Sequence, residues 1–146
     1  MKKITRKILS LTLAVLLLAC TLLLTGCNQE PLVIKDSETC IVIKPTAQSM
    51  DGKTDMVLLD YMNQLAQEGT LTCAISNGMV TSINGIDNPA DFSSCWMLYT
   101  SDAENANTAW GTVEYNGSTY GSAISGAETL KIKPDVLYIW VFQSFS

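Results

Sequence analysis

Two pairs of aspartates have a spacing that could support catalysis or cation binding. Asp51 and Asp55 stand four positions apart, and so do Asp87 and Asp91. Paired carboxylates hydrolyse glycosides when they face each other across a cleft, and calcium binds where several oxygen ligands converge. Neither pair has the EF-hand spacing, and both lie among glycine, asparagine and proline residues typical of turns. We therefore expect turn and helix-cap roles for these aspartates, and no metal site.

The residue types that most enzymes use as nucleophiles and proton carriers are absent or isolated. The chain has no histidine, which excludes Ser–His and Cys–His catalysis and every histidine-based metal site. It also has no C-x-x-C motif and no glycine-rich phosphate loop followed by lysine and a hydroxyl residue. We expect a protein that is not an enzyme, with no catalytic residue and no cofactor.

The clearest chemical signal of the sequence is Cys27. Four basic residues within positions 1–7 precede an apolar run from Ile8 to Leu24, and small residues follow. A basic start, an apolar middle and a small-residue end are the layout of a secretory signal. The ending Leu24-Thr25-Gly26-Cys27 resembles the bacterial lipobox, in which the cysteine thiol is coupled to diacylglycerol and becomes the first residue after cleavage. The alternative is an uncleaved membrane anchor, because a run of about 17 residues is near the lower limit for spanning.

This signal predicts three segments and a location. Residues 1–26 are expected to be a lipoprotein signal peptide, residues 27–38 a lipidated tether, and residues 39–146 one folded domain. The lipid on Cys27 would anchor the chain to the bilayer at the extracytoplasmic face of the bacterial cell membrane.

Charge narrows the choice of partners. Residues 27–146 keep five lysines, no arginine and all 14 acidic residues, which gives a formal charge of −9. A chain this acidic is a poor candidate for binding nucleic acid. The expected partners are the lipid bilayer, through Cys27, and either a small molecule or a protein of the cell envelope.

Three further cysteines, Cys40, Cys73 and Cys95, follow the lipidation site, while Cys20 leaves with the signal peptide. Outside the cytoplasm a disulfide can persist, and three thiols allow one bridge in three possible pairings. The alternative is that all three are buried as small hydrophobic side chains. The sequence does not choose between these outcomes.

The pattern of apolar residues predicts an α+β domain. One helix is expected over residues 54–68, with Thr54 as its N-cap, Gly69 as its stop and an apolar stripe that includes Leu58, Met62 and Leu65. The expected strands are at 39–43, 71–75, 79–83, 95–99 and 136–142, and a second hairpin is expected over 110–121. Asn-Gly turns are expected at 77–78, 84–85 and 116–117, and a polar loop at 101–109. We expect a β-grasp-like mixed sheet with one helix after the first strand, β-hairpins, and a final strand that returns to the middle.

Aromatic residues are concentrated in the strand and hairpin half of the chain. They include Trp96, Tyr99, Trp110, Tyr115 and Tyr120. Aromatic faces can stack on flat ligands or sugars. The alternative is that Trp96 and Tyr138 belong to the core and that only Trp110 and Tyr115 present an edge to solvent.

Several short segments together resemble a family of bacterial surface proteins of unassigned function, which is similar to the C-terminal β-domain of transcobalamin and intrinsic factor. The segments are Val57-Leu58-Leu59-Asp60-Tyr61, residues 77–85 with their Ser-Ile-Asn-Gly turn, Cys95-Trp96-Met97-Leu98-Tyr99, Tyr120-Gly121 and Tyr138-Ile139-Trp140. The resemblance implies a β-grasp-type fold. In the vitamin carriers this domain covers one face of cobalamin, while a separate α/α barrel holds the other.

The resemblance also implies positions for a ligand surface. These are Asn84 and Gly85 in the turn and Trp96 and Tyr99 on the strand, with Trp110 as a neighbour. The chain departs from the family where Tyr99-Thr100-Ser101-Asp102 replaces the usual Asn-Gly continuation of the tryptophan strand. We expect a non-enzymatic ligand- or partner-binding domain, with cobalamin as the named candidate ligand. The alternative is a structural or interaction module of a cell-envelope complex.

Overall fold

Two antiparallel sheets and one helix make up residues 32–145, the part of the chain that this computed structural model describes. The larger sheet has six strands in the order β1–β2–β9–β6–β8–β7, and the smaller has the order β3–β4–β5. The elements are β1 (Val33–Ser37), β2 (Cys40–Ile43), α2 (Leu58–Gln67), β3 (Cys73–Ser76), β4 (Met79–Ile83), β5 (Ile86–Asp87), β6 (Ser94–Thr100), β7 (Ala106–Tyr115), β8 (Ser118–Ala123) and β9 (Tyr138–Ser144). The fold is mostly β-sheet with one helix, which agrees with the predicted α+β class.

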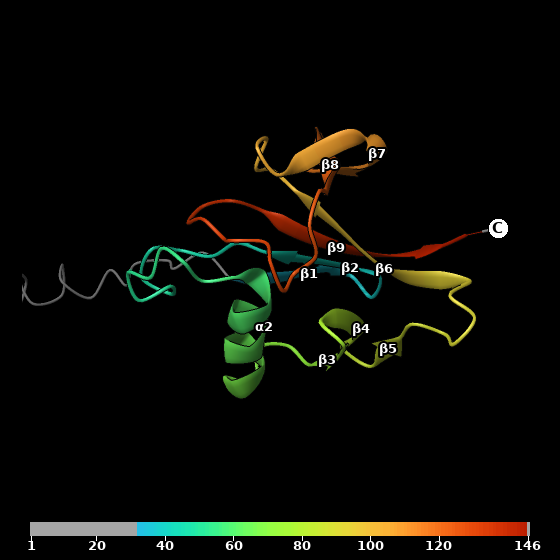
Figure 1. Cartoon of the computed structure of the whole chain (residues 1–146), viewed down its shortest axis with the longest axis horizontal. Helices are drawn as coiled ribbons and strands as arrows, with labels where there is room; N and C mark the ends of the chain where they lie inside the picture. The colour runs from blue at the N-terminus through green and yellow to red at the C-terminus, as the bar shows by residue number, and fades with distance from the viewer. Residues whose placement is uncertain (1–31, 146) are drawn as a thin grey trace, which may run out of the picture. The chain divides into compact units, whose positions relative to one another are not determined.

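The helix and the small sheet lie on the same side of the large sheet, and the β7–β8 hairpin lies on the other side (Figure 1). The predicted return of the last strand to the middle of the sheet is confirmed, because β9 lies between β2 and β6. The expectation of a mixed sheet is wrong, since every strand pair within the described residues is antiparallel. After the β8–β9 connection, β9 runs antiparallel to both of its neighbours, β2 and β6.

The strand predicted at 39–43 corresponds to β2, but another strand, β1, precedes it and was not predicted. Val33–Ser37 belong to β1 and pair with β2, so a hairpin, and not a single strand, precedes the helix. These residues were expected to form part of a tether because β1 is an edge strand whose last three residues are exposed and polar. Residues 27–31 of the predicted tether, including Cys27, and the whole predicted signal peptide lie outside the described residues.

The helix also begins later than predicted, and Thr54 is not its N-cap. The N-cap is Val57, which makes no side-chain capping bond. The N–H groups of Leu58 and Leu59 instead donate to the carbonyls of Leu130 (2.8 Å) and Ala127 (2.9 Å). A neighbouring backbone segment therefore satisfies the free N–H groups at the helix start, which a side chain usually does.

The predicted end and apolar face of the helix are confirmed. Gly69 has a φ of 74°, and its N–H donates to the Ala66 carbonyl at 3.1 Å. The fully buried face contains Leu58, Tyr61, Met62 and Leu65. Within residues 32–145, no helix has the length and apolar character needed to cross a membrane.

The three Asn-Gly turns are confirmed. Both residues of each turn have positive φ values, from 48° to 83°, as two-residue hairpin turns require. They join β3 to β4, β4 to β5 and β7 to β8. Local residue type is therefore enough to place these reversals of the chain.

The large sheet has a hydrophobic core on each face. The main core lies toward the helix and includes Ile41, Tyr138 and Trp140, while the second core lies on the opposite face. The members of the second core that are buried are Val42, Tyr99, Tyr115 and Ile139. Because side chains alternate between the faces of a strand, β2, β6 and β9 are apolar at almost every position.

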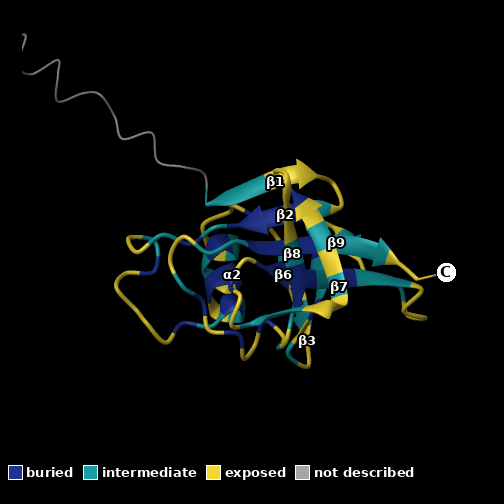
Figure 2. Ribbon diagram, turned by 90° about the horizontal axis from the view of Figure 1, so that it is seen from above, coloured by how far each residue is buried: buried dark blue, intermediate teal, exposed yellow. Residues whose placement is uncertain are grey.

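The β7–β8 hairpin covers the second core. β8 pairs with β6 at two positions only, Tyr99 with Ser122 and Thr100 with Gly121. Beyond them the hairpin leaves the sheet and crosses over β9, where it covers the buried strands (Figure 2). A Cβ on Gly121 would stand 3.1 Å from the backbone of Asn107 and Thr108, so this close approach favours glycine.

The predicted polar loop at 101–109 is only partly a loop. β7 already begins at Ala106, and Asp102 is buried. Burial alone would raise the pKa of the Asp102 carboxyl. Its pKa is nevertheless below the usual value, because the carboxylate accepts hydrogen bonds from the side-chain amide of Asn105 (2.8 Å) and the backbone N–H of Glu104 (3.2 Å) and lies 2.9 Å from the ammonium of Lys133. These contacts tie the β6–β7 connection to the segment that leads into β9.

Candidate functional site

A cavity of about 470 Å³ lies against the face of the large sheet that carries the main core. Its walls come from the β3–β4 turn, from β6 and β9, and from residues 122–129, which include the end of β8 and the segment after it. We call it the tryptophan cavity, because Trp96 and Trp140 both line it. Its volume falls in the range of small-molecule sites.

Strand register brings the two tryptophans to one face. Trp96 on β6 is paired with Phe142, and Trp140 on β9 is paired with Leu98, two positions along the same ladder. The Trp96 ring is fixed, since its Nε1–H donates to the Ile86 carbonyl at 2.8 Å and its ring lies 5.4 Å from that of Phe142. Trp96 therefore forms a rigid aromatic wall.

The indole nitrogen of Trp140 is the unusual polar group of the cavity wall. Trp140 is only 5% exposed, and its Nε1–H has no hydrogen-bond partner among the described residues. An unpaired buried donor costs about 1–3 kcal/mol, and folded proteins contain few of them. The nitrogen itself is buried, so a ligand in the cavity would contact other atoms of the Trp140 ring.

Two of the exposed side chains that line the cavity are large and apolar. Met79, next to the β3–β4 turn, is 51% exposed, and Ile124, just after β8, is 45% exposed. Large apolar side chains that surround a concave site are typical of ligand-binding surfaces. These two side chains could close over an apolar ligand.

Two further polar groups line the cavity. The Ser122 hydroxyl comes from a residue that is only 6% exposed. The carboxylate of Glu128 lies against Gly78, where its Oε2 fills the space that a Cβ would need. Gly78 therefore has two reasons to be glycine, its φ of 76° and the adjacent carboxylate.

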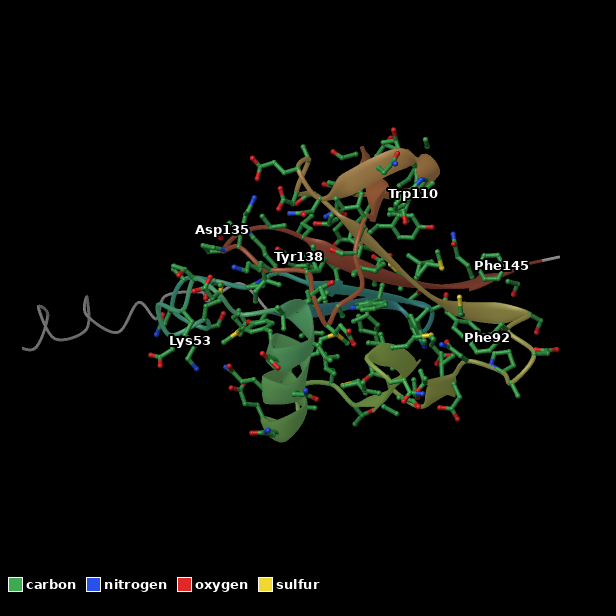
Figure 3. The ribbon with its side chains drawn as sticks, viewed as in Figure 1. Lys53, Phe92, Trp110, Asp135, Tyr138 and Phe145 are labelled. Atoms are coloured by element: carbon green, nitrogen blue, oxygen red, sulfur yellow. The ribbon has the colours of Figure 1, made fainter. Side chains whose placement is uncertain are left out.

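Of the sequence-predicted ligand positions, Trp96 lines the cavity and the other four lie elsewhere. Tyr99 is three positions from Trp96 on the same strand, so it points to the opposite face, where its hydroxyl donates to Gln143 Oε1 at 2.9 Å. Trp110 is 63% exposed and lies on β7, away from the helix side of the sheet (Figure 3).

Asn84 and Gly85 form the β4–β5 turn and are not among the residues that line the cavity. The Asn84 side chain has a local role, because its Oδ1 accepts a hydrogen bond from the Thr72 N–H at 3.0 Å. The Asn-Gly turn that reaches the cavity is the one at Asn77 and Gly78.

Sequence reasoning missed the roles of Trp140, Met79 and Glu128. For Trp140 a signal was present, since alternation along the last strand places it on the same face as the buried Tyr138. No local pattern marks Met79 or Glu128. They line the same cavity only because the segment after β8 passes beside the β3–β4 turn.

The aspartate pairs do not form a site. All four aspartates are exposed, and residues 32–145 contain no group of three or more Cys, Asp or Glu side chains that could hold a metal ion. Asp91 accepts hydrogen bonds from the N–H and the hydroxyl of Ser93, which lower its pKa. Asp55, expected in the first turn of the helix, instead pairs with Lys131 at 3.0 Å.

Cys40, Cys73 and Cys95 are free thiols and each is partly buried. Burial raises the pKa of all three thiols. No disulfide joins them, and the alternative of three buried small hydrophobic side chains is met only in part, because none of the three is fully buried.

Comparison of the chain with models of protein families, with curated proteins and with solved structures found no match. The tryptophan cavity is therefore the basis for assigning a function.

Proposed function

We propose that the domain is a non-enzymatic binding module and that the tryptophan cavity is its ligand site. The observation that carries this proposal is the cavity of about 470 Å³ that Trp96 and Trp140 line together with the exposed side chains of Met79 and Ile124. The ligand has an apolar body, which packs on the two tryptophans and under Met79 and Ile124. Apolar burial contributes about 25 cal/mol per Å² of surface removed from water.

We further propose that a lipid on Cys27 holds this domain at the extracytoplasmic face of the bacterial membrane. The support is the lipobox-like Leu24-Thr25-Gly26-Cys27 and the signal-like segment before it. Cells given labelled palmitate should incorporate it into the chain but not into a Cys27→Ser variant. Failure of the unchanged chain to take up the label would overturn the anchor.

The β-grasp relationship and corrinoid binding are narrower proposals. A β-grasp-like arrangement is supported by the position of α2 after the first hairpin and of β9 beside β2. Cobalamin binding is supported by Trp96 alone among the positions that the resemblance implies. Cobalamin is therefore a second ligand to test in the same experiment.

The alternative function, an interaction module of an envelope complex, would use exposed apolar side chains outside the cavity. Phe92 and Phe145 are 57% and 52% exposed and lie near the same end of the domain (Figure 3). The Phe145 N–H donates to the carbonyl of Ser93, the neighbour of Phe92, at 2.8 Å.

Ligand binding can be tested on the three tryptophans of the chain, each of which gives one indole N–H signal. The full chain, labelled with ¹⁵N at its indoles and held in detergent micelles, is titrated with N-acetylphenylalanine amide, and separately with cobalamin, up to about 10 mM. The amide has an apolar ring, no charge and two acceptors. We expect the Trp140 signal to shift most, the Trp96 signal less, and the exposed Trp110 signal not at all.

A Trp140→Phe variant tests the contribution of the larger ring. Followed by the Trp96 signal, it should weaken binding of the amide about threefold, because the smaller ring gives up part of the apolar contact. A Trp110→Phe variant is the matched control and should bind as the unchanged chain does. If neither probe moves the Trp140 signal, the cavity is not the site and the interaction module becomes the better assignment.

A further inference from the structure

We infer that the tryptophan cavity selects a small organic cation and that Glu128 sets this charge preference. The inference rests on the proposed function, because it names the class of ligand that the same cavity takes. It concerns the mouth of the cavity, whereas the apolar contacts with Trp96 and Trp140 concern its wall.

Glu128 is the only charged residue that lines the cavity. It is exposed, and its carboxylate is positioned by the Cα of Gly78, which leaves room for it only because there is no Cβ. The ion pairs within residues 32–145 join Lys131 and Lys133 to Asp55, Asp102 and Glu104, and none of them includes Glu128. The carboxylate is thus available to a ligand.

The aromatic walls of the cavity and the net charge of the chain also favour a positively charged ligand. The faces of Trp96 and Trp140 attract cations through their ring quadrupoles. Residues 27–146 carry a formal charge of −9, which raises the local concentration of cations and repels anions. An amine beside Glu128 and an apolar body against Trp96 and Trp140 therefore describe one ligand.

A metal ion does not fit this site. A single carboxylate supplies too few ligands for calcium or magnesium, and residues 32–145 contain no cluster of three or more acidic or sulfur ligands. An organic amine needs only one carboxylate and gains from the apolar walls. The ligand class is therefore an amphipathic organic cation of a size that fits about 470 Å³.

Three probes that share a benzyl group and a carbonyl acceptor test the charge preference. Phenylalanine amide is a cation, N-acetylphenylalanine amide is neutral and N-acetylphenylalanine is an anion at pH 6, where the titrations are run. Each is titrated into the full chain and followed by the Trp140 indole signal, with Trp110 as the internal control. We expect affinity to fall in the order cation, neutral, anion, with about tenfold between the first and the last because attraction by Glu128 is replaced by repulsion.

Two variants with the same change in net charge test whether Glu128 causes this order of affinities. Glu128→Gln should weaken the cation about fivefold, the size of a partly exposed ion pair, and leave the neutral probe unchanged. Glu68→Gln, at the end of α2 and outside the cavity, should leave all three affinities unchanged.

The outcomes separate the two proposals. If the neutral probe shifts Trp140 but the three probes bind equally, or if Glu128→Gln keeps the order, the charge inference is wrong and the binding function stands. If no probe shifts Trp140, the binding function itself is wrong.

Discussion

Replacing Tyr99 with alanine should lower the free energy of unfolding by about 3–5 kcal/mol, the usual cost of removing a buried aromatic ring. Tyr99 is 2% exposed and packs with Val42, Tyr115 and Ile139 in the second core. It joins the sheet to the β7–β8 hairpin, so its loss leaves a cavity that only this hairpin can fill. Urea unfolding followed by circular dichroism measures the effect.

Tyr99→Phe is the matched control for this prediction. It keeps the ring and removes only the hydrogen bond to Gln143, which contributes about 1 kcal/mol. Because Tyr99 lies on the face opposite the tryptophan cavity, the phenylalanine variant should bind the neutral probe as the unchanged chain does. A Tyr99→Ala variant as stable as the unchanged chain would show that the hairpin does not cover this face.

The separation of Tyr99 from Trp96 shows what the sequence could and could not predict about the site. The strand at 95–99 was predicted, and so was its burial on both faces. Treating Trp96 and Tyr99 as one ligand surface ignored their odd spacing, which sends the two side chains to opposite faces. The resemblance to known carriers suggested the pair, whereas strand geometry separates them.

Local chemistry predicted the turns and most strands. An Asn-Gly pair adopts positive φ values with little strain, so it marks a hairpin wherever it stands between apolar strands. The helix stop at Gly69 follows from the same freedom of glycine. These features depend on neighbouring residues alone.

Features that depend on distant segments were missed. The helix begins at Leu58 because the carbonyls of Ala127 and Leu130 accept its first N–H groups. The residues near Thr54 do not indicate this start, because the two carbonyls come from a distant part of the chain. β1 forms because β2 offers it an edge, although its own composition resembles a linker. The tryptophan cavity combines the β3–β4 turn with residues some 50 positions later, so no window of sequence contains it.

Replacing Leu65 with alanine should lower the free energy of unfolding by about 2–5 kcal/mol, while Asn63→Ala, on the exposed side of the same helix, should change it by less than about 0.5 kcal/mol. Leu65 is fully buried in the main core, and the helix is the only one within the described residues. A ten-residue helix is marginal alone in water, so its stability depends on this packing.

Alanine raises helix propensity more at Asn63 than at Leu65, but by less than about 0.7 kcal/mol. This gap is small beside the expected loss at Leu65, so the difference between the variants mainly reports packing against the sheet, which urea unfolding measures. Equal stabilities would mean that α2 does not pack on the main core. The first N–H groups of α2 donate to the carbonyls of Leu130 and Ala127, and Ala127 also lines the cavity. Undocking the helix should therefore also broaden the Trp140 indole signal and leave that of Trp110 sharp.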